Sequence, residues 1–470
     1  MTTGSVEPPI VGFDQTRKRY LMKAEHLQRH GGMVPRYTSY PTAPHFHDGI
    51  TPDIYRQWLS EISPDSSLSL YFHVPFCHAM CWYCGCHTKV VNRYDPIGNY
   101  ASLLKKEFEL VAPSLPEGPK VTHVHWGGGT PTILSAEDFT MLMETMHKHV
   151  TFSETAEVAV EIDPRTLSLD MIKALAAAGV NRASLGIQDF NDNVQQAINR
   201  IQTFETTKEK VDSLRANGIQ SINFDLMYGL PLQTIADVQR TVDLAIKMRP
   251  DRLSIFGYAH VPWMKTHQKK ILDADLPGDI ERMDQADSTA ERLVEHGYVR
   301  IGLDHFAHPE DSLAIALKQG KLERNFQGYT NDGADNLIGF GSSAIGNLKQ
   351  GYIQNQVPFR QYGAAIEAGE FPIAKGIALN QEDYIRRQII ERLMCDLEVN
   401  LEDITTGHSL APDTFDSEIE ALQPMQQDQL LEITGRQITV NEEGRHLIRS
   451  VCAMFDTYLK AGKARHSKAV

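Results

Sequence analysis

The chain has 470 residues, of which 41% are hydrophobic and 23% are charged, as in ordinary globular proteins. The formal net charge of −14 argues against a broad nucleic-acid-binding surface, because neutralising phosphates requires clustered Lys and Arg. No apolar stretch approaches the length of about 18 residues that a membrane span needs, and the first ten residues do not resemble a signal peptide. We therefore expect a cytoplasmic protein with reduced cysteines, no membrane partner and no nucleic-acid partner.

Short β-rich runs alternate with amphipathic helical segments along most of the chain. The expected strands cover 69–74, 122–126, 157–163, 182–188, 221–226, 252–257 and 299–304, and the helices include 99–112, 168–178, 191–199, 205–217, 234–247 and 280–296. This alternation predicts a parallel sheet, and six or more such units indicate an α/β fold with a partial or full (β/α) barrel. The chemistry of such barrels lies at the carboxyl ends of the strands.

The two ends of the chain depart from this pattern. We expect residues 1–60 to form an N-terminal arm, 61–370 the barrel domain and 371–470 a mainly helical C-terminal domain. The C-terminal region combines a helical segment at 380–395 with a short β-like segment at 436–441, which is compatible with a winged helix. Because 399–433 is rich in acidic residues, we interpret this domain as a lid or docking domain and not as a DNA reader.

Four cysteines lie together after the first expected strand: Cys77, Cys81, Cys84 and Cys86. The first three share the spacing C-x3-C-x2-C on one short loop. Three thiolates on such a loop can bind three irons of a cubane iron–sulfur cluster and leave the fourth iron open for a small ligand. Cys86 is only two residues from Cys84, so we expect that it is not a ligand.

Structural zinc and a disulfide scaffold are the alternatives for these cysteines. Zinc is conceivable because histidines lie nearby, but zinc sites usually join two separated pairs of ligands. Six cysteines in 470 residues are too sparse for a disulfide scaffold. The two remaining cysteines, Cys395 and Cys452, lie in apolar helical runs and are expected in the core.

Polar or glycine-rich features follow six of the expected strands, and they begin with the cysteine loop. Three consecutive glycines can form a tight turn, or they can let a ligand approach main-chain carbonyls. Two carboxylates on one strand face can act as a general acid and base, or form salt bridges with Arg165 or Arg182. The features after the cysteine loop are Gly127–Thr130, Glu161 with Asp163, Gln188, Asp225 and 258–260.

Arg36 and Arg324 are candidates for binding substrate carboxylates, because the guanidinium fork can hold a carboxylate through two hydrogen bonds. Surface salt bridges are the simpler alternative for both. Tyr71, in the first strand, is either a core aromatic or a ligand contact.

The cysteine loop resembles the signature of the radical S-adenosylmethionine (SAM) enzymes. The resemblance implies that Cys77, Cys81 and Cys84 bind a [4Fe–4S] cluster and that SAM binds the open iron. Reduction of SAM then gives a 5′-deoxyadenosyl radical, so that the cofactors carry the radical chemistry and the protein positions them.

Longer segments resemble one family of these enzymes, the oxygen-independent coproporphyrinogen III oxidases. They are Pro-Arg-Tyr-Thr-Ser-Tyr-Pro-Thr at 35–42, Cys-Gly-Cys at 84–86, Gly-Leu-Asp-His-Phe-Ala at 302–307, Arg-Asn-Phe-Gln-Gly-Tyr-Thr at 324–330 and Phe-Asp-Thr-Tyr-Leu at 455–459. One departure is Gly257, where the family usually has Asn, and it leaves the contacts of that loop open.

The family resemblance implies oxidative decarboxylation of the ring A and ring B propionates of coproporphyrinogen III. The products are the vinyl groups of protoporphyrinogen IX, in haem biosynthesis. A haem-binding chaperone of the same superfamily is the alternative, but those relatives typically lack the fourth cysteine and the 324–329 segment. Action of a radical SAM enzyme on another substrate also stays open.

The same resemblance implies two SAM molecules per chain. The first is expected to contact Tyr71, Gly128, Glu161 and Ile345. The second is expected to contact Tyr83, Gly129, Thr130, Gln188, Arg200, Asp225 and Ala259.

Arg200 can pair with the carboxylate of the second SAM, and Asp225 can bind its ribose or balance its sulfonium, unless both form ordinary ion pairs. A low-potential electron donor such as flavodoxin or ferredoxin is the expected partner. We expect a monomer in which the arm and the C-terminal domain close over the barrel mouth.

Overall fold

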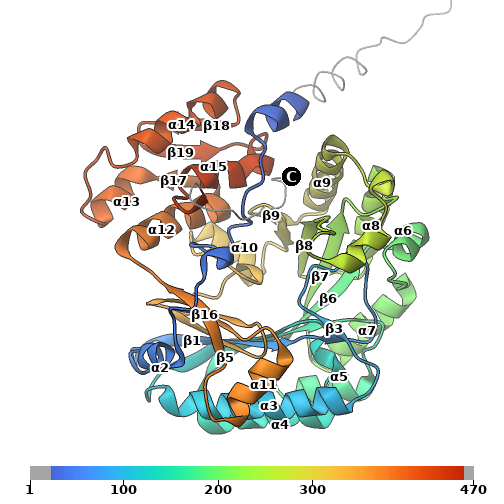
Figure 1. Cartoon of the computed structure of the whole chain (residues 1–470). Coiled ribbons are helices and arrows are strands. Elements are labelled where there is room, and N and C mark those ends of the chain that lie inside the picture. The colour runs from blue at the N-terminus through green and yellow to red at the C-terminus, as the bar shows by residue number, and fades with distance from the viewer. Residues whose placement is uncertain (1–22, 460–470) are drawn as a thin grey trace, which may run out of the picture.

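One large curved sheet organises the molecule (Figure 1). The computed structural model describes residues 23–459, so the expected features of 1–22 lie outside the described residues. Within the described range the sheet has twelve strands, in the order β16-β15-β14-β13-β1-β4-β5-β6-β7-β8-β10-β9. The strands β16 and β9 form two open edges, so the sheet does not close on itself. The barrel is therefore partial, which is one of the two forms expected from the α/β pattern.

The first six expected strands form a parallel array in chain order, which confirms them. They are β1 (Ser67–Val74), β4 (Lys120–Gly128), β5 (Thr151–Ile162), β6 (Arg182–Gln188), β7 (Ser221–Tyr228) and β8 (Arg252–Gly257). A parallel strand that the pattern did not predict, β13 (Asn336–Phe340), pairs with the other side of β1.

The seventh expected strand, at 299–304, is shorter and does not continue the parallel array. It forms β9 (Val299–Ile301), which pairs antiparallel with β10 (His305–Ala307), and β10 pairs antiparallel with β8. The chain reverses at Gly302, whose φ of +54° favours glycine. A strand-like composition therefore predicted a strand here but not its direction.

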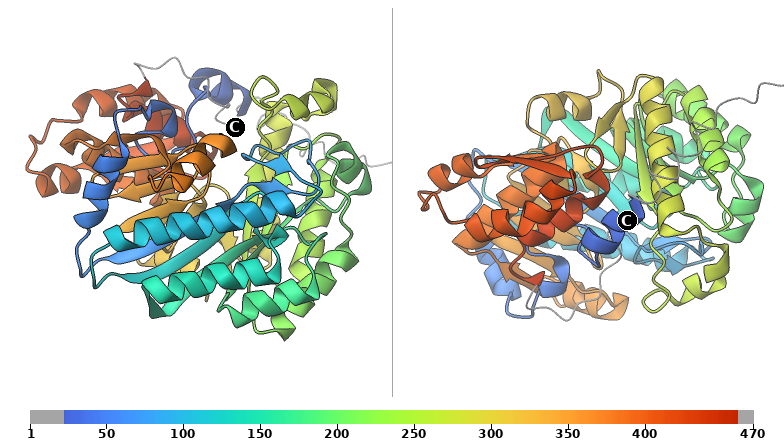
Figure 2. Two further views of the ribbon diagram at one scale, coloured as in Figure 1. Left: turned by 60° about the horizontal axis from the view of Figure 1, so that its bottom comes forward. Right: turned by 90° about the horizontal axis from the view of Figure 1, so that it is seen from above.

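Helices cover the outer face of the parallel array (Figure 2). Four of them begin at a Ser or Thr whose side chain accepts a hydrogen bond from the backbone of the first turn, namely Ser135, Ser168, Thr203 and Thr234. The helices are α3 (Asp95–Val111), α4 (Ala136–His149), α5 (Leu169–Ala177), α6 (Asp192–Ala197), α7 (Phe204–Ala216), α8 (Ile235–Lys247) and α9 (Asp279–Glu295).

The core under these helices is strongly aromatic near β1. Phe72 stacks between Trp126 and Phe340, with ring centroids 4.4 and 4.8 Å away. All three side chains are almost fully buried, so each contributes a large apolar area to folding. The stack joins β4, β1 and β13 and fixes the first strand, from which the cysteine loop leaves.

The sheet continues beyond residue 370, where we had expected the barrel domain to end. After β13 it adds the antiparallel strands β14 (Ile345–Leu348), β15 (Gly351–Asn355) and β16 (Ile373–Ala378), with α11 (Phe359–Glu367) between the last two. The backbone of 373–378 pairs with β15, and helical structure begins only with α12 (Gln381–Asp396).

The C-terminal region has its own hydrophobic core. Its helices are α12, α13 (Leu401–Gly407), α14 (Asp416–Gln427) and α15 (Ile448–Met454), and its strands are β17 (Glu398–Asn400), β18 (Leu431–Thr434) and β19 (Gln437–Val440). These strands form a small antiparallel sheet, so the helix at 380–395 and the β segment at 436–441 are confirmed. Cys395 and Cys452 are fully buried, as expected.

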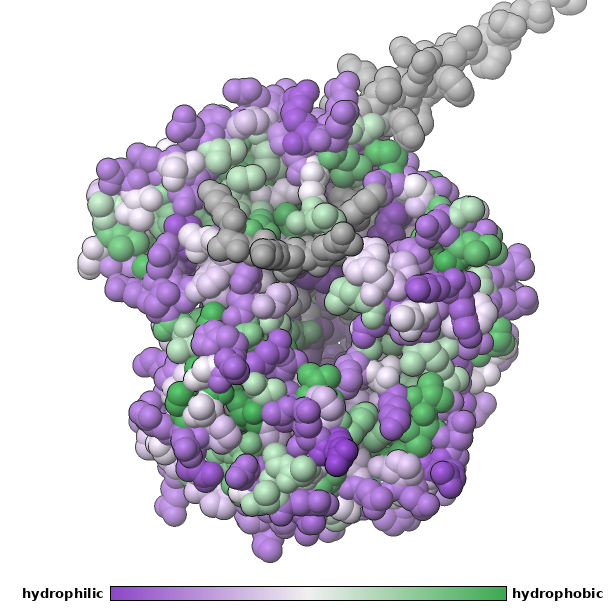
Figure 3. Space-filling model, viewed as in Figure 1, coloured by the Kyte–Doolittle hydropathy of each residue, from purple (hydrophilic) through white to green (hydrophobic). Residues whose placement is uncertain are grey.

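The N-terminal arm joins the barrel to the C-terminal region. Its helical residues 23–30 place Lys23 2.7 Å from both Asp284 and Asp287 of α9, and His30 2.6 Å from Asp428 beyond α14. Further along, Tyr37 and Tyr40 belong to the C-terminal core, and α2 (Pro52–Ser60) packs on the barrel core. The surface is hollowed between the C-terminal elements and the barrel (Figure 3).

The remaining short elements lie around this hollow or on the cysteine loop. They are β2 (Phe76–Cys77), β3 (Lys89–Val90), α10 (Ser312–Lys318), β11 (Glu323–Asn325) and β12 (Gly328–Thr330). No helix within residues 23–459 has the length and apolarity that a membrane crossing requires.

Candidate active site

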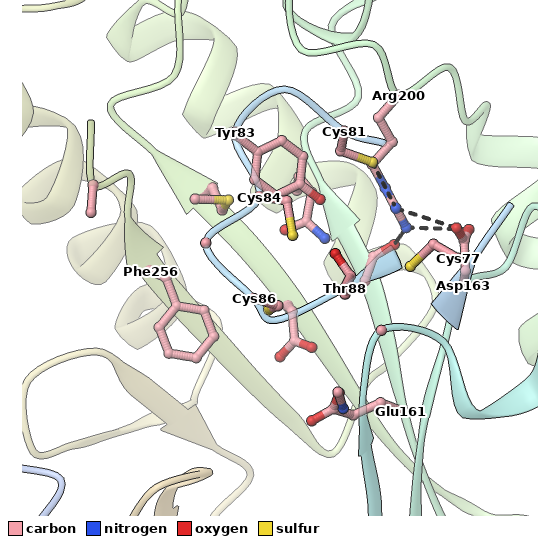
Figure 4. A pocket seen from close by; sticks show the side chains of 18 of the residues that line it. Cys77, Cys81, Tyr83, Cys84, Cys86, Thr88, Glu161, Asp163, Arg200 and Phe256 are labelled. Carbon is pink, nitrogen blue, oxygen red and sulfur yellow. Dashed lines mark hydrogen bonds and ion pairs between the residues drawn. The ribbon is translucent and has the colours of Figure 1, made fainter. Parts of the chain in front are cut away.

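The carboxyl ends of the parallel strands surround a cavity of about 650 Å³, which we call the cysteine cavity (Figure 4). Because parallel strands end at one edge of a sheet, it collects residues far apart in sequence. It brings together the three predicted cluster ligands, Cys77, Cys81 and Cys84. It also brings together nine of the eleven predicted SAM contacts: Tyr83, Gly128, Gly129, Thr130, Glu161, Gln188, Arg200, Asp225 and Ala259.

The other two predicted SAM contacts do not line this cavity. Tyr71 lies behind Glu161, with its hydroxyl 2.8 Å from His73 Nδ1 and its ring stacked on His125. Ile345 begins β14 and packs against a cluster containing Phe46 and Tyr352. Their roles as SAM contacts stay predictions.

The thiols of the cysteine loop are free and surrounded by hydrogen-bond donors. Thr130 Oγ1 lies 3.4 Å from Cys77 Sγ, while Arg165 Nη2 and Arg200 Nη1 lie 3.6 and 3.7 Å from Cys81 Sγ. Cationic donors beside a sulfur favour the thiolate, which is the form that binds a metal. Figure 4 shows Arg200 between Cys81 and Asp163.

The thiols differ in acidity. A hydrogen bond from the Cys86 thiol, acting against burial, lowers the pKa of Cys84 to about 6. Burial raises the pKa of Cys77 to about 11, so this thiol keeps its proton at neutral pH. Metal binding would therefore have to displace that proton. Cys86 itself is exposed to the cavities.

The donor set fits an iron–sulfur cluster better than zinc. A structural zinc ion takes four ligands that converge at roughly 2.0–2.3 Å. Within residues 23–459 no group of three or more His, Cys, Asp or Glu side chains is placed to hold a single metal ion. Three thiols spread along one loop instead suit separate corners of a cubane.

The glycine run approaches the cysteine loop closely. A Cβ at Gly129 would lie 2.6 Å from the Phe76 carbonyl oxygen, and one at Gly128 would lie 2.7 Å from the His73 ring. Gly128 also has a φ of +115°, which side chains rarely adopt. The glycines therefore let β4 pack against the start of the cysteine loop, a structural reason that the sequence alone did not reveal.

Glu161 is held as a carboxylate. Its Oε1 lies 3.1 Å from His125 Nε2, and its Oε2 accepts the Gly128 N–H at 3.0 Å. Burial alone raises the pKa of Glu161, but these hydrogen bonds outweigh burial and keep the pKa below its usual value. Since Glu161 lines the cavity, its charge is available to a bound cation.

Asp163 is used differently, in an ion-pair network. Arg165 Nη2 donates to Asp163 at 2.6 Å, which is one of the two salt bridges considered from the sequence. Arg182 pairs instead with Glu157 at 3.0 Å. Arg200 lies 3.4 Å from Asp163 and donates to the Gly186 carbonyl. Its buried Nε, however, has no hydrogen-bond partner among residues 23–459.

Asp225 accepts hydrogen bonds from neutral side chains, with Ser184 Oγ at 3.0 Å and Asn223 Nδ2 at 2.9 Å. Burial, and next the negative charge of Glu161, raise the pKa of Asp225 to about 6. A cationic ligand in the cavity would stabilise this charge.

A second cavity, of about 700 Å³, lies between the arm, the barrel and the C-terminal region. We call it the arginine cavity, because Arg36, Arg282, Arg324 and Arg449 all line it. It shares a wall with the cysteine cavity, formed by Arg36, Cys86, Phe256, Gly257 and Ala259.

Four arginines and two carboxylates, Asp279 and Asp304, line the arginine cavity, so positive charge is in excess there. Burial, and next repulsion from Arg36, lower the pKa of Arg449 to about 10. Within residues 23–459, Nε and Nη1 of Arg324 make no hydrogen bond although both are buried. Unpaired buried donors are costly, so this cavity suits an anionic ligand.

Arg282 and Arg449 were not predicted from the sequence. Arg282 lies on the helix α9 and Arg449 on α15, and neither belongs to a recognisable motif. Only the packing of the arm and the C-terminal region brings them beside Arg36 and Arg324, the two candidates that the sequence offered.

Comparisons with known proteins agree with this fold and site. A model of the radical SAM superfamily matches residues 71–245, and a model described as the HemN C-terminal domain matches residues 379–447. The barrel and its three-cysteine loop therefore define a radical SAM enzyme.

Relatives with high sequence identity show which family of radical SAM enzymes the chain belongs to. The oxygen-independent coproporphyrinogen III oxidase of Bradyrhizobium diazoefficiens is 50% identical over 93% of this chain and 97% of its own length. That of Escherichia coli is 40% identical over 93% and 96%. A solved structure, coproporphyrinogen III oxidase from Escherichia coli, matches with a TM-score of 0.86 and 39% identity, over 91% of this chain and 100% of that chain. The chain belongs to the family of oxygen-independent coproporphyrinogen III oxidases.

Proposed function

We propose that this enzyme decarboxylates the ring A and ring B propionates of coproporphyrinogen III to the vinyl groups of protoporphyrinogen IX. The observation that carries the proposal is the shared wall between the cavity that holds the three predicted cluster ligands and the cavity that holds four arginines. The first suits a [4Fe–4S] cluster with SAM, and the second suits a substrate whose periphery carries several carboxylates.

The reaction divides between the two cavities. When bound, the cofactors supply a carbon radical that takes one hydrogen atom from the β-carbon of a propionate. Loss of CO2, with transfer of one electron to an electron acceptor, then leaves the vinyl group. The chain's own residues position the two partners, with Glu161 and the glycine run on the cofactor side and the arginines on the substrate side.

The walls of the arginine cavity also suit the exclusion of water. Met33, Arg36 and Thr38 of the arm line one side, and His446 and Arg449 of the C-terminal region line another. A carbon radical must be kept from solvent and from other hydrogen donors, so closure by these segments supports the reaction.

The proposal includes two SAM molecules per chain. All seven residues expected around the second SAM line the cysteine cavity, and among them Arg200 has an unpaired buried Nε and Asp225 has neutral neighbours. These groups suit the carboxylate and the sulfonium of SAM. Anaerobic equilibrium binding should give two SAM per chain, and one in Arg200→Ala; a value of one in the unchanged protein would remove the second site.

The proposal also includes the electron donor, the oligomeric state and the location of the protein. We infer a low-potential donor of the flavodoxin or ferredoxin kind and a monomer in the cytoplasm. The net charge of −14 supports the monomer, because it disfavours self-association. Sedimentation equilibrium at working concentration measures the mass directly.

Anaerobic turnover tests the function. With SAM, a reductant and coproporphyrinogen III, mass spectrometry should show loss of two CO2 and appearance of two vinyl groups. A Cys84→Ser variant is the control that lacks a cluster ligand. Formation of 5′-deoxyadenosine without any vinyl product would mean that the enzyme acts on another substrate.

A further inference from the structure

Four stretches of more than 20 residues in this acidic chain contain no carboxylate, namely 26–47, 66–94, 252–272 and 336–366, and two of them meet at the cysteine loop. Residues 66–94 hold the cysteine loop, and residues 252–272 hold the end of β8 and the segment after it, yet neither contains Asp or Glu among 60 acidic residues in the chain. Basic residues occur in both, with Lys89 and Arg93 in the first and three lysines in the second.

These segments lie against each other beside the cluster ligands. His267 Nε2 lies 2.8 Å from the Cys84 carbonyl oxygen, and Lys265 Nζ donates to the Cys86 carbonyl at 2.9 Å. Gln268 donates to the Tyr83 carbonyl at 2.9 Å, and Lys270 Nζ lies 5.1 Å from the centre of the Trp82 ring. The 261–272 segment thus covers the outer side of the cysteine loop.

The outer side of this segment is apolar as well as basic. Trp263 is 54% exposed and Met264 65% exposed, beside the exposed Lys269 and Lys270. Met264 also lines the cysteine cavity and Trp263 lines the arginine cavity, so this segment lies where both cavities reach the surface. The next carboxylate along the chain, Asp273, pairs with His260 at 2.9 Å. We define Trp263, Met264, Lys265, Lys269 and Lys270 as the basic patch.

We propose that the basic patch is the docking surface of an acidic one-electron carrier protein. The inference rests on the proposed function, since only a redox cluster needs a reductant. In the docked complex, one electron passes from the carrier to the cluster. The carrier is thereby oxidised and the cluster reduced, and no bond forms or breaks. Exposed apolar side chains within a charged rim suit the small, transient interfaces of electron-transfer partners.

Charge identifies the kind of partner. A carrier with a net negative surface is repelled by most of this protein, whose formal charge is −14, and attracted by the acid-free segments. The basic patch differs from the other carboxylate-free segments because its segment covers the outer side of the cysteine loop, so attraction here places the carrier beside the predicted cluster ligands. Although Trp263 and Met264 of the patch line the two cavities, Lys269 and Lys270 line neither, so the charge of these two lysines is left for a partner outside the cavities.

Reversing two charges tests the proposal with the full chain. The probe is a purified acidic flavodoxin, and the double variant is Lys269→Glu with Lys270→Glu. Isothermal titration with oxidised flavodoxin at low ionic strength should show affinity reduced roughly tenfold or more. Binding to the unchanged protein should weaken as ionic strength rises from about 0.05 to about 0.3 M, because salt screens exposed charges.

Kinetics provide the second readout. Cluster reduction by flavodoxin should slow in the double variant, while reduction by dithionite, a small ion, should stay within twofold. The matched control, Lys148→Glu with Lys173→Glu, reverses two exposed lysines on α4 and α5 and should change neither rate.

Three results would overturn the docking surface: unchanged flavodoxin affinity in the double variant, equal losses with flavodoxin and dithionite, or no flavodoxin binding by the unchanged protein. Failure of the unchanged protein to cleave SAM with dithionite would instead count against the proposed function.

Discussion

The two cavities share a wall, but the chain assembles them in different ways. The cysteine cavity takes its residues from the ends of neighbouring strands and the loops after them, so one sheet sets their spacing. The arginine cavity takes Arg36 from the arm, Arg282 from α9, Arg324 from β11 and Arg449 from α15. The difference indicates that cofactors bind a preformed frame, whereas substrate binding depends on how separate parts of the chain close together.

The largest expected effect lies in the cysteine cavity. Cys84→Ser removes one of three cluster ligands, so iron content should fall to near zero and activity should be lost. Cys86→Ser, two residues away, should keep its full iron content. Iron analysis and the visible spectrum of anaerobically reconstituted protein measure both. Loss of the cluster in Cys86→Ser would make Cys86 a ligand and contradict the assignment.

The second-largest expected effect distinguishes substrate binding in the arginine cavity from SAM binding in the cysteine cavity. Arg324→Ala should raise the KM for coproporphyrinogen III roughly 10- to 100-fold, because a charge-assisted hydrogen bond contributes about 1.5–3 kcal/mol. Its SAM stoichiometry should not change. Arg200→Ala is the matched substitution in the cysteine cavity and should lose one SAM instead. If both variants lose SAM to the same degree, the cavities do not divide the ligands in this way.

The same difference explains what the sequence could predict. The parallel strands and most residues of the cysteine cavity were predictable, because Cys77, Gly128, Glu161 and Asp225 lie near the carboxyl ends of β-rich runs or just after them, and parallel strands end at one edge. The family resemblance assigned their roles. Arg282 and Arg449 were not predictable, since an isolated Arg on an amphipathic helix looks like ordinary surface charge.

The sequence patterns also did not show the direction of every strand or where the sheet ends. The run 299–304 has strand composition, but after the reversal at Gly302 its strand β9 pairs with β10, and β10 in turn pairs with β8. The β13 segment was not predicted although Gly341-Ser342-Ser343 follow it, and its pairing with β1 reveals it. The sheet extends past residue 370 because β16 pairs with β15, a long-range contact that periodicity does not report.

A moderate effect of pH should appear in the cysteine cavity alone. The pKa of Asp225 is about 6, so its carboxyl is ionised above this pH and protonated below it. Affinity for the proposed second, positively charged SAM should therefore fall roughly two- to fourfold between pH 7.5 and pH 5.5. Glu161, whose pKa lies below its usual value, stays ionised over this range. Asp225→Asn should bind weakly at both pH values, and a persistent pH dependence in that variant would assign the titration to another group.

The smallest expected effect concerns the closure of the arm. Asp428→Asn weakens contacts with Arg29 and His30 at the protein surface. Exposed ion pairs contribute about 0.2–1 kcal/mol, so the free energy of unfolding should fall by no more than that. Glu420→Gln, an exposed residue of α14, is the control. Urea denaturation of both variants measures the difference, and a loss of several kcal/mol would mean that the contacts of Asp428 act as a buried ion-pair network.

Hydrogen transfer between the two cavities is the central claim, and isotope labelling tests it most directly. Coproporphyrinogen III deuterated at the β-carbons of its propionates is incubated anaerobically with the enzyme, SAM and a reductant. The account predicts deuterium in the 5′-deoxyadenosine, together with a vinyl product. Unlabelled 5′-deoxyadenosine formed alongside the vinyl product would contradict it.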